Sequence, residues 1–191
     1  MQLKNLNCSF LGKTYNFYNE IDSTQDEIWR LIENNKIKNG QVISANIQTN
    51  GKGTHGRIWH TDESNNIAFS FYVEINKNIS VLDGLTYEIA QNITDIFLEK
   101  YNINLQIKKP NDIMCNNKKV GGILTESKVT KDMVKYLVIG IGINTNKQYF
   151  TDDIKDIATS IKSEYGVEIN SQDFISEFCN KFEKIIQKRS E

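Results

Sequence analysis

The chain has 191 residues, of which 39% are hydrophobic and 10% aromatic, and this supports one globular domain with a sizeable core. Lys and Arg number 23 against 24 Asp and Glu, a net charge of -1 that excludes a strongly basic nucleic-acid-binding surface, so no nucleic-acid partner is expected. We find neither a charged-then-apolar leader nor an apolar run near about 18 residues, so the chain is expected to be cytoplasmic and to have no membrane partner.

The cysteines and histidines do not form a metal-binding pattern. Cys8, Cys115 and Cys179 are odd in number, widely spaced and not in Cys-x-x-Cys pairs, and the two histidines are His55 and His60. A zinc site is therefore not expected. Three reduced thiols in a cytoplasmic protein are the simplest interpretation.

The first forty residues are predicted to contain two strands and one helix. Residues 1–20 have the pattern of two short strands around the Gly12-Lys13 turn. Ser23 or Thr24 then caps a helix, since each is followed three positions later by an acidic residue. Gly40 ends this unit. The buried stripe of the helix is expected to consist of Ile28, Leu31 and Ile32.

A glycine-rich loop between two strands is the first candidate functional segment. One strand is predicted up to about Gln48 and a half-buried, alternating one over Ile67–Ile75. Between them, Gly51–Gly56 matches G-x-G-x-x-G, but a dinucleotide-binding fold needs a helix after the third glycine, and no helical pattern follows. A P-loop is excluded too, because no Gly-Lys-Ser/Thr closes the motif. The loop instead carries Lys52, His55, Arg57 and Trp59, which suit a ligand with an anionic part and a flat ring.

The next segment is predicted to be a long amphipathic helix followed by short strands. Residues 81–100 place apolar side chains at helical spacing, namely Leu82, Leu85, Ile89, Ile93, Ile96 and Phe97. The stretch "NLQIKK" is a short strand leading into Pro110-Asn111-Asp112. "IMC" and "VGGILTES" then form a hairpin around residues 116–119.

Glycines inside predicted strands are the second candidate feature. "VGGILTES" and the following strand "VKYLVIGIGINT" both carry them, although glycine weakens a strand interior and often marks the close approach of a ligand. If the two strands are neighbours, Gly121, Gly140 and Gly142 are expected to form a flat floor without side chains, on which a ring or chain could lie.

Two helices are predicted to close the chain. One covers about 154–165 with Gly166 as its C-cap, and the other runs from Ser171 or Gln172 to about Lys188. The order of the elements predicts an α+β fold with a mixed, largely antiparallel sheet flanked by helices and covered on one face.

Taken together, these segments resemble the catalytic domain of biotin–protein ligases, also called biotin–acetyl-CoA-carboxylase ligases. The resemblance spans residues 22–146 and is carried by "DSTQ", "QTNGKGTHGRIW", "KKPNDI", "KKVGGILTE" and "GIGINTN". It implies the α+β fold shared with class II aminoacyl-tRNA synthetases and lipoate ligases. It also implies that the biotin carboxylate attacks the α-phosphate of ATP, giving biotinyl-5′-AMP and pyrophosphate, and that a lysine of a biotin carboxyl carrier protein then takes the biotinyl group.

The resemblance also implies roles for individual residues. Lys119, Asp112 and Arg57 would be catalytic, with Lys119 contacting the carboxylate and the α-phosphate. ATP would be bound by Arg57, Trp59, Asn111, Lys119 and Asn144, with Mg²⁺ carried by ATP and no protein metal site. Biotin would be bound by Ser23, Thr24, Gln25, Gln48, Lys52, Gly53, Thr54, Lys119, Gly121, Gly140 and Gly142.

The chain departs from the family pattern in ways that bear on function. Family members usually have Gly-Arg-Gly-Arg in the loop, so Lys52 loses the planar guanidinium fork and Thr54 loses a charge that helps to hold the acyl-adenylate. Lys109 replaces a tryptophan before Pro110. Residues 1–191 are expected to form one catalytic domain, without an N-terminal helix-turn-helix and without the small C-terminal β-barrel of many members.

Three functions are consistent with the sequence. Ligation of biotin to protein is favoured, because the polar groups of Ser23, Thr24 and Gln48 suit a ureido ring better than an apolar dithiolane. A lipoate or octanoate transferase on the same fold is the nearest enzyme alternative. The other alternative is a protein that binds biotin or its adenylate with weak transfer, as Thr54 would suggest. A monomer and a homodimer are both compatible with the sequence.

Overall fold

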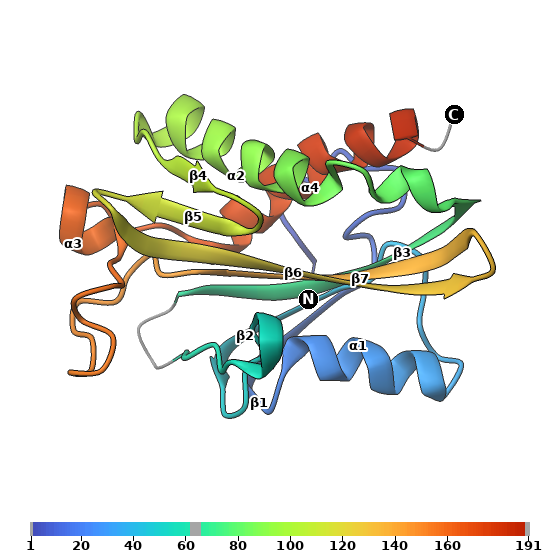
Figure 1. Ribbon diagram of the computed structural model, residues 1–191, viewed down its shortest axis with the longest axis horizontal. Coiled ribbons are helices and arrows are strands. Elements are labelled where there is room, and N and C mark those ends of the chain that lie inside the picture. The colour runs from blue at the N-terminus through green and yellow to red at the C-terminus, as the bar shows by residue number, and fades with distance from the viewer. Residues whose placement is uncertain (1, 62–65, 190–191) are drawn as a thin grey trace.

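The computed structural model describes residues 2–61 and 66–189, which form an α+β fold around one sheet (Figure 1). The seven strands of this sheet lie in the order β1-β2-β3-β7-β6-β5-β4. Among them β1 and β2 are parallel and the other neighbouring pairs are antiparallel, which confirms the mixed, largely antiparallel prediction. The strands are β1 (Tyr15–Ile21), β2 (Val42–Gln48), β3 (Ile67–Asn78), β4 (Gln106–Lys108), β5 (Asp112–Cys115), β6 (Lys118–Thr130) and β7 (Met133–Ile143).

Helices cover both faces of the sheet, so the predicted cover on one face is wrong. Figure 1 shows α2 (Leu85–Tyr101) and α4 (Ser171–Arg189) on one face and α1 (Thr24–Glu33) on the other. The sequence pattern of α1 shows that it has an apolar stripe but not which face of the sheet the stripe covers. Of the described residues, no helix is long and apolar enough to cross a membrane.

The inner strand β3 is buried on both sides along most of its length rather than half-buried as predicted. Phe71 packs against Phe178 and Phe182 of α4, with ring centroids 5.7 and 5.2 Å apart. On the opposite face Tyr72 belongs to a second apolar cluster with Ile28 of α1. Burying a phenylalanine side chain contributes about 1.5–3 kcal/mol, so β3 is held from both sides. Side chains of β3 do point alternately to the two faces of the sheet, but α1 covers the face that would otherwise contact water.

Residues 2–14 contain no strand, contrary to the prediction of two strands over residues 1–20. β1 begins at Tyr15, and the preceding segment is held by the carboxylate of Glu183 in α4. Its oxygens accept hydrogen bonds from the backbone N–H groups of Ser9 (2.6 Å), Phe10 (3.0 Å) and Leu11 (2.9 Å). Burial raises the pKa of Glu183, and these hydrogen bonds lower it. Their combined effect is larger than that of burial, so the pKa of Glu183 lies below its usual value. The Glu183 side chain thus accepts the backbone hydrogen bonds that a neighbouring strand would otherwise accept.

The helix predicted over residues 154–165 is much shorter. α3 covers Ile161–Tyr165 and ends at Gly166, whose φ of 70° confirms the predicted glycine C-cap. The segment before α3 pairs with β6 instead: the Lys119 N–H donates to the Ile157 carbonyl (2.8 Å), and the Thr159 N–H donates to the Lys119 carbonyl (2.9 Å). These long-range bonds replace the local ones of a helix and fix the backbone of Lys119.

The other predicted elements are confirmed with small shifts. The β5–β6 hairpin, β7 and α4 lie where they were expected, while α2 starts at Leu85 because Ile79–Leu82 form a 3-10 turn. Ser23 is the residue that caps α1, and its side chain accepts from the Asp26 N–H (3.3 Å). The three cysteines, Cys8, Cys115 and Cys179, are free thiols, and the structure places all three in buried positions.

Candidate functional site

Strand register places three glycines on the α1 face of the sheet. Gly122 of β6 is paired with Gly142 of β7, and Leu124 with Gly140 two residues on, so Gly122, Gly140 and Gly142 share one face. Gly121 has the opposite orientation, because a Cβ there would meet the Ile113 side chain at 3.4 Å. The floor predicted from Gly121, Gly140 and Gly142 is therefore corrected to Gly122, Gly140 and Gly142.

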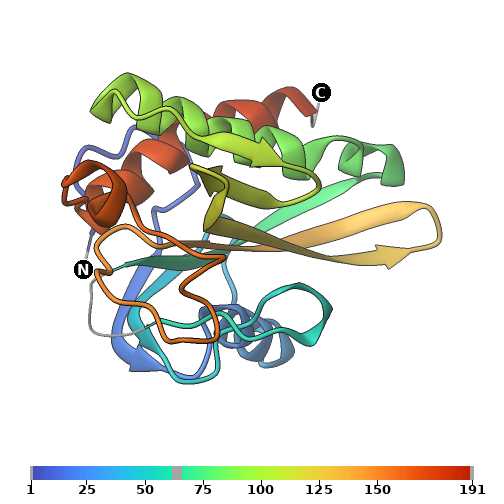
Figure 2. The ribbon, with the colours of Figure 1, turned by 60° about the vertical axis from the view of Figure 1, so that its left-hand side comes forward.

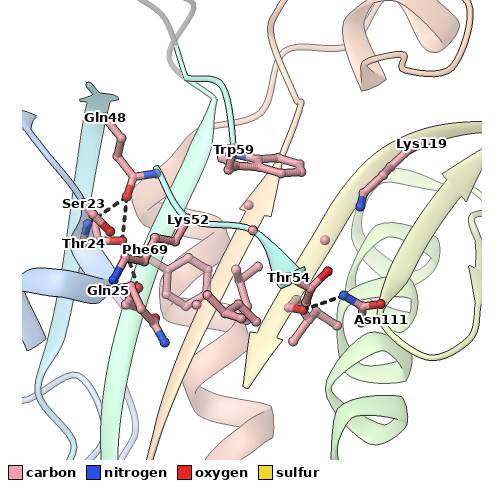
Figure 3. A pocket seen from close by; sticks show the side chains of 18 residues that line it. Ser23, Thr24, Gln25, Gln48, Lys52, Thr54, Trp59, Phe69, Asn111 and Lys119 are labelled. Carbon is pink, nitrogen blue, oxygen red and sulfur yellow. Dashed lines mark hydrogen bonds between the residues drawn. The ribbon is translucent and has the colours of Figure 1, made fainter. Parts of the chain in front are cut away.

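A small cavity lies over this floor, and we call it the floor chamber (Figure 3). Its walls are the start of α1 (Ser23–Gln25), the end of β2 at Gln48, the glycine-rich loop with Lys52–Thr54 and Trp59, and Lys119 of β6. Its volume of about 40 Å³ is below the roughly 300 Å³ at which most ligand pockets begin.

Hydrogen bonds between α1 and β2 fix one polar wall of the floor chamber. The Thr24 backbone N–H and side-chain hydroxyl both donate to Gln48 Oε1, at 2.8 and 3.0 Å, and Thr24 Oγ1 lies 2.9 Å from Ser70 Oγ (Figure 3). Because a backbone N–H can only donate, the Gln48 atom facing it must be oxygen. The Gln48 Nε2 group is then the end left for a ligand, and it presents donors.

An ion pair holds the turn that carries this wall. Arg30 donates to both carboxylate oxygens of Asp22, at 2.6 and 2.7 Å, and Asp22 Oδ1 accepts from the Ser23 N–H at 2.8 Å. The hydrogen bonds from Arg30 lower the pKa of Asp22 to about 2. This Arg30–Asp22 ion pair positions the start of α1, although both side chains are exposed enough for solvent to screen their interaction.

Gln25 presents the opposite polarity. Its Nε2 donates to Glu126 Oε2 (2.8 Å) and to the Val138 carbonyl (3.2 Å). Its Oε1 is buried and has no hydrogen-bond partner within the described residues. A Cβ on Gly140 would lie 2.7 Å from this oxygen, so the carboxamide rests directly on the glycine floor. Gln25 therefore offers an acceptor where Gln48 offers a donor.

Lys119 lies at the end of the floor chamber, beside Asp112. Its Nζ is 2.5 Å from Asp112 Oδ1. The β5–β6 register shifts between Ile113 and Met114, and such a bulge re-aims neighbouring side chains. Asp112 is not among the described residues that line the cavity, and it contacts the site through Lys119.

Trp59 lies across the floor between the two ends of the site (Figure 3). A Cβ on Gly142 would be 2.3 Å from its indole ring, so only glycine fits beneath it. Lys119 Nζ lies 5.9 Å from the centroid of the ring, within cation–π range. The indole Nε1 is buried without a hydrogen-bond partner among the described residues. Because Trp59 covers Gly142, a ring-sized ligand requires it to move.

A second cavity of about 180 Å³, here called the loop chamber, lies on the other side of Trp59 and Lys119. It is lined by the glycine-rich loop (Gly53, Thr54, Arg57–His60), by Lys119 and by the segment after β7. Figure 2 shows these two loops side by side. The segment after β7 contributes Asn144, Lys147, Phe150, Ile154, Ile157 and Ala158.

The loop chamber suits an anion attached to an apolar group. Arg57, Lys119 and Lys147 are cationic, and no Asp or Glu is among its described lining residues. Lys147 is 7% exposed, with its Nζ 5.4 Å from the Phe150 ring centroid. Sequence reasoning missed His60, Lys147, Phe150 and Ile154. The basic and aromatic residues directly after "GIGINTN" were the available signal, but residues 154 onward were assigned to a helix.

The structure divides the predicted binding residues between the chambers. Arg57 and Asn144 line the loop chamber, whereas Asn111 lines the floor chamber and its Nδ2 donates to the Ile123 carbonyl at 3.0 Å. Lys52 forms an ion pair with Asp26. Arg57 Nη2 donates to Thr54 Oγ1 at 3.0 Å, so the loop residue that lacks the family's charge contacts one that keeps it. Within the described residues, no group of three or more His, Cys, Asp or Glu side chains could hold a metal ion.

Comparison with known proteins identifies the family. Residues 17–144 match the model of the Biotin/lipoate A/B protein ligase family, and the chain belongs to that family. The Bacillus subtilis bifunctional ligase/repressor BirA is 35% identical over 181 residues, covering 94% of this chain and 55% of the relative. The chain thus spans about half the length of this relative.

Solved structures share the fold. A biotin protein ligase from Aquifex aeolicus in complex with biotin and ATP superposes with a TM-score of 0.74 and 29% identity, over 92% of this chain and 71% of that one. A Leishmania major biotin protein ligase in complex with biotin gives a TM-score of 0.68 and 25% identity, over 93% and 79% of the two chains. In both of these structures the protein is in complex with biotin.

Proposed function

We propose that this chain is the catalytic domain of an ATP-dependent biotin–protein ligase. It would join biotin to ATP as biotinyl-5′-AMP and then transfer the biotinyl group to a lysine of a biotin carboxyl carrier protein. The observation that carries the proposal is the position of Lys119, whose side chain lines both the floor chamber and the loop chamber. One cation therefore borders a site for a polar ring with an acidic tail and a site for a nucleotide.

The floor chamber fits biotin better than lipoate. A cyclic urea has two N–H donors and one carbonyl acceptor, which complement the Gln25 acceptor and the Gln48 donor. A dithiolane has neither, so it would leave the buried Gln25 Oε1 unpaired, and an unpaired buried acceptor costs about 1–3 kcal/mol. A site built around hydrogen bonds rejects ligands that lack them more strongly than an apolar site can.

The loop chamber would take ATP. Trp59 supplies a flat aromatic surface for the adenine, Arg57 and Lys119 face the phosphates, and Asn144 lies on the ribose-phosphate side. Among the described residues that line this chamber, none carries a carboxylate that would repel the phosphates. Magnesium would be carried by the phosphate oxygens of ATP, where it would neutralise charge during phosphoryl chemistry.

In the first step a biotin carboxylate oxygen attacks the α-phosphorus of ATP. A bond from this oxygen to phosphorus forms, the bond to the bridging oxygen of the β-phosphate breaks, and pyrophosphate leaves with the electron pair. Two anions must approach each other, so a fixed cation between them stabilises the transition state more than the separated reactants. Lys119 is placed for this role because its backbone is held by the Ile157–Thr159 segment and its Nζ by Asp112.

In the second step the acceptor lysine amine attacks the biotinyl carbonyl carbon. An amide C–N bond forms, the C–O bond to the phosphate breaks, AMP leaves and the amine loses a proton. Asp112 lies beside Lys119 and can orient either that side chain or the incoming amine. Residues of the glycine-rich loop would exclude water from the mixed anhydride meanwhile.

The residue Thr54 favours a second candidate function, a biotin- or adenylate-binding protein with weak transfer. It lines both chambers without supplying a charge. A lipoate or octanoate transferase is the further alternative within the family, and the unpaired Gln25 acceptor disfavours it. The proposed ligase would act in the cytoplasm, and the three free thiols support a reducing compartment. It would be a monomer or a homodimer.

A transfer assay separates these functions. The protein is incubated with ATP, Mg²⁺ and an apo carboxyl-carrier domain, with biotin or lipoate in turn, and the acceptor is weighed by mass spectrometry. The proposal predicts a biotin-sized mass increase that requires ATP. A gain with lipoate alone would establish the transferase. Biotin-dependent pyrophosphate release without acceptor modification would establish the weak-transfer protein.

A further inference from the structure

Glu126 of β6 is not among the described residues that line the floor chamber, and it contacts the site through the side chain of Gln25. Glu126 pairs with Val138 of β7, the next position on the same face of the sheet after the Leu124–Gly140 pair. It is half-buried, and its Oε2 accepts from Gln25 Nε2 (2.8 Å) and from the Trp29 indole N–H (2.7 Å). Trp29 itself packs edge-on against Tyr136, with ring centroids 6.0 Å apart.

These bonds determine which end of the Gln25 carboxamide faces the floor. A glutamine side chain can rotate by half a turn and exchange its donor and acceptor ends. The groups facing its outer end are the Glu126 carboxylate and the Val138 carbonyl, and an ionised carboxylate and a carbonyl only accept. The amide nitrogen must therefore point outward and the oxygen inward, over Gly140. The indole N–H in turn holds the Glu126 oxygen in place.

We propose that Glu126 is a positioning residue that sets the hydrogen-bond polarity of the floor chamber and thereby selects ligands with an N–H donor. This inference rests on the proposed function and deepens it, because the ureido N–H of biotin is the donor that Gln25 Oε1 would receive. Without Glu126, the Gln25 amide is held by the one longer hydrogen bond to the Val138 carbonyl and can rotate. The Gln25 NH2 group would then face the ureido N–H of biotin, and two donors cannot form a hydrogen bond.

The test compares Glu126→Met with Glu126→Gln, which keeps an acceptor for Gln25 and Trp29. Glu20→Met, at an exposed position of β1, is the matched control. In Glu126→Met the affinity for biotin measured by calorimetry is expected to fall about tenfold, the cost of one buried hydrogen bond. Glu126→Gln is expected to retain most of the affinity, and the KM for ATP and the kcat at saturating biotin are expected to change little in both variants.

A ligand with one donor removed distinguishes positioning from a general loss of structure. Biotin methylated at each ureido nitrogen in turn serves as the probe. For the isomer that lacks the N–H facing Gln25, wild type and Glu126→Met are expected to bind equally. If wild type and Glu126→Met bound biotin with equal affinity, the positioning role of Glu126 would be overturned while the proposed function would stand. The same conclusion would follow if Glu126→Met lost affinity equally for biotin, for both methylated probes and for ATP. A wild-type protein that binds no biotin would overturn the proposed function and this inference with it.

Discussion

The floor chamber and the loop chamber share Trp59 and Lys119 but are built in different ways. Paired strands and the capped start of α1 form most of the first, where hydrogen bonds fix each polar end. Two loops form most of the second, and its lining is mainly apolar but includes three cationic side chains. In the proposed ligase, regular structure would provide selectivity for the ring of biotin, while the two loops would enclose the nucleotide. Substitutions in the two chambers should therefore affect different ligands.

Replacing Lys119 should have the largest effect, because this residue serves both chambers. In Lys119→Ala, adenylate formation is expected to fall by about a hundredfold or more, since a preorganised charge is lost where charge develops. ATP–pyrophosphate exchange measures the step. The neighbouring Lys118→Ala is the control, because Lys118 Nζ donates to the Lys155 carbonyl instead. Wild-type exchange in Lys119→Ala would refute the role assigned to it.

A methyl group on the floor should weaken biotin binding, and at Gly140, which lines the floor chamber alone, it should spare ATP. In Gly142→Ala the new Cβ would lie 2.3 Å from the Trp59 indole, and in Gly140→Ala 2.7 Å from Gln25 Oε1. Overpacking costs about 1–3 kcal/mol, which corresponds to roughly 5- to 150-fold weaker biotin binding by calorimetry. At Gly122 the new Cβ would be in ordinary contact at 3.4 Å, so Gly122→Ala should have the smallest effect of the three. An equal loss at all three would contradict the geometry.

The reverse pattern is expected for Arg57, which lines the loop chamber alone. Arg57→Ala should raise the KM for ATP by about tenfold, as expected for loss of a charge-assisted hydrogen bond, and leave the affinity for biotin nearly unchanged. Steady-state kinetics with each substrate varied in turn checks both values. A larger change for biotin than for ATP would show that the chambers are not separate sites.

Thr54 allows the opposite experiment, a gain of function. Thr54→Arg restores the charge that the family usually carries, so biotinyl-5′-AMP should dissociate several-fold more slowly, in line with the value of a charged hydrogen bond. Release of the adenylate is followed by chromatography after a single turnover. Thr54→Val, which adds no charge, should leave the release rate near wild type.

The smallest effect on activity is expected from Glu183, which lies away from both chambers. Its folded pKa lies below the usual value, so its stabilisation is present above about pH 4.3 and is lost as pH falls through the folded pKa. Glu183→Gln should therefore be less stable near pH 7 by about 2 kcal/mol, and the difference should narrow in acid. Denaturant unfolding at several pH values measures it, and a difference that widens in acid would contradict this account.

The sequence predicted the order of most elements because their apolar spacing is local. It did not predict register, and register decides which of two adjacent glycines faces the ligand, so Gly121 was chosen where the structure has Gly122. It also missed long-range substitutes for local bonds. The Glu183 carboxylate replaces a strand partner for Ser9–Leu11, and β6 replaces the helix expected before Ile161. Ile154 was overlooked for this reason, because it lies in the segment that was assigned to that helix.

A crystal structure with biotin and a nonhydrolysable ATP analogue tests the central claim most directly. The two-chamber account predicts the ureido ring against Gln25 and Gln48, the acid tail on Gly142 with Trp59 displaced, and the α-phosphate beside Lys119. Biotin bound away from the three glycines, or a nucleotide whose phosphates lie far from Lys119, would contradict it.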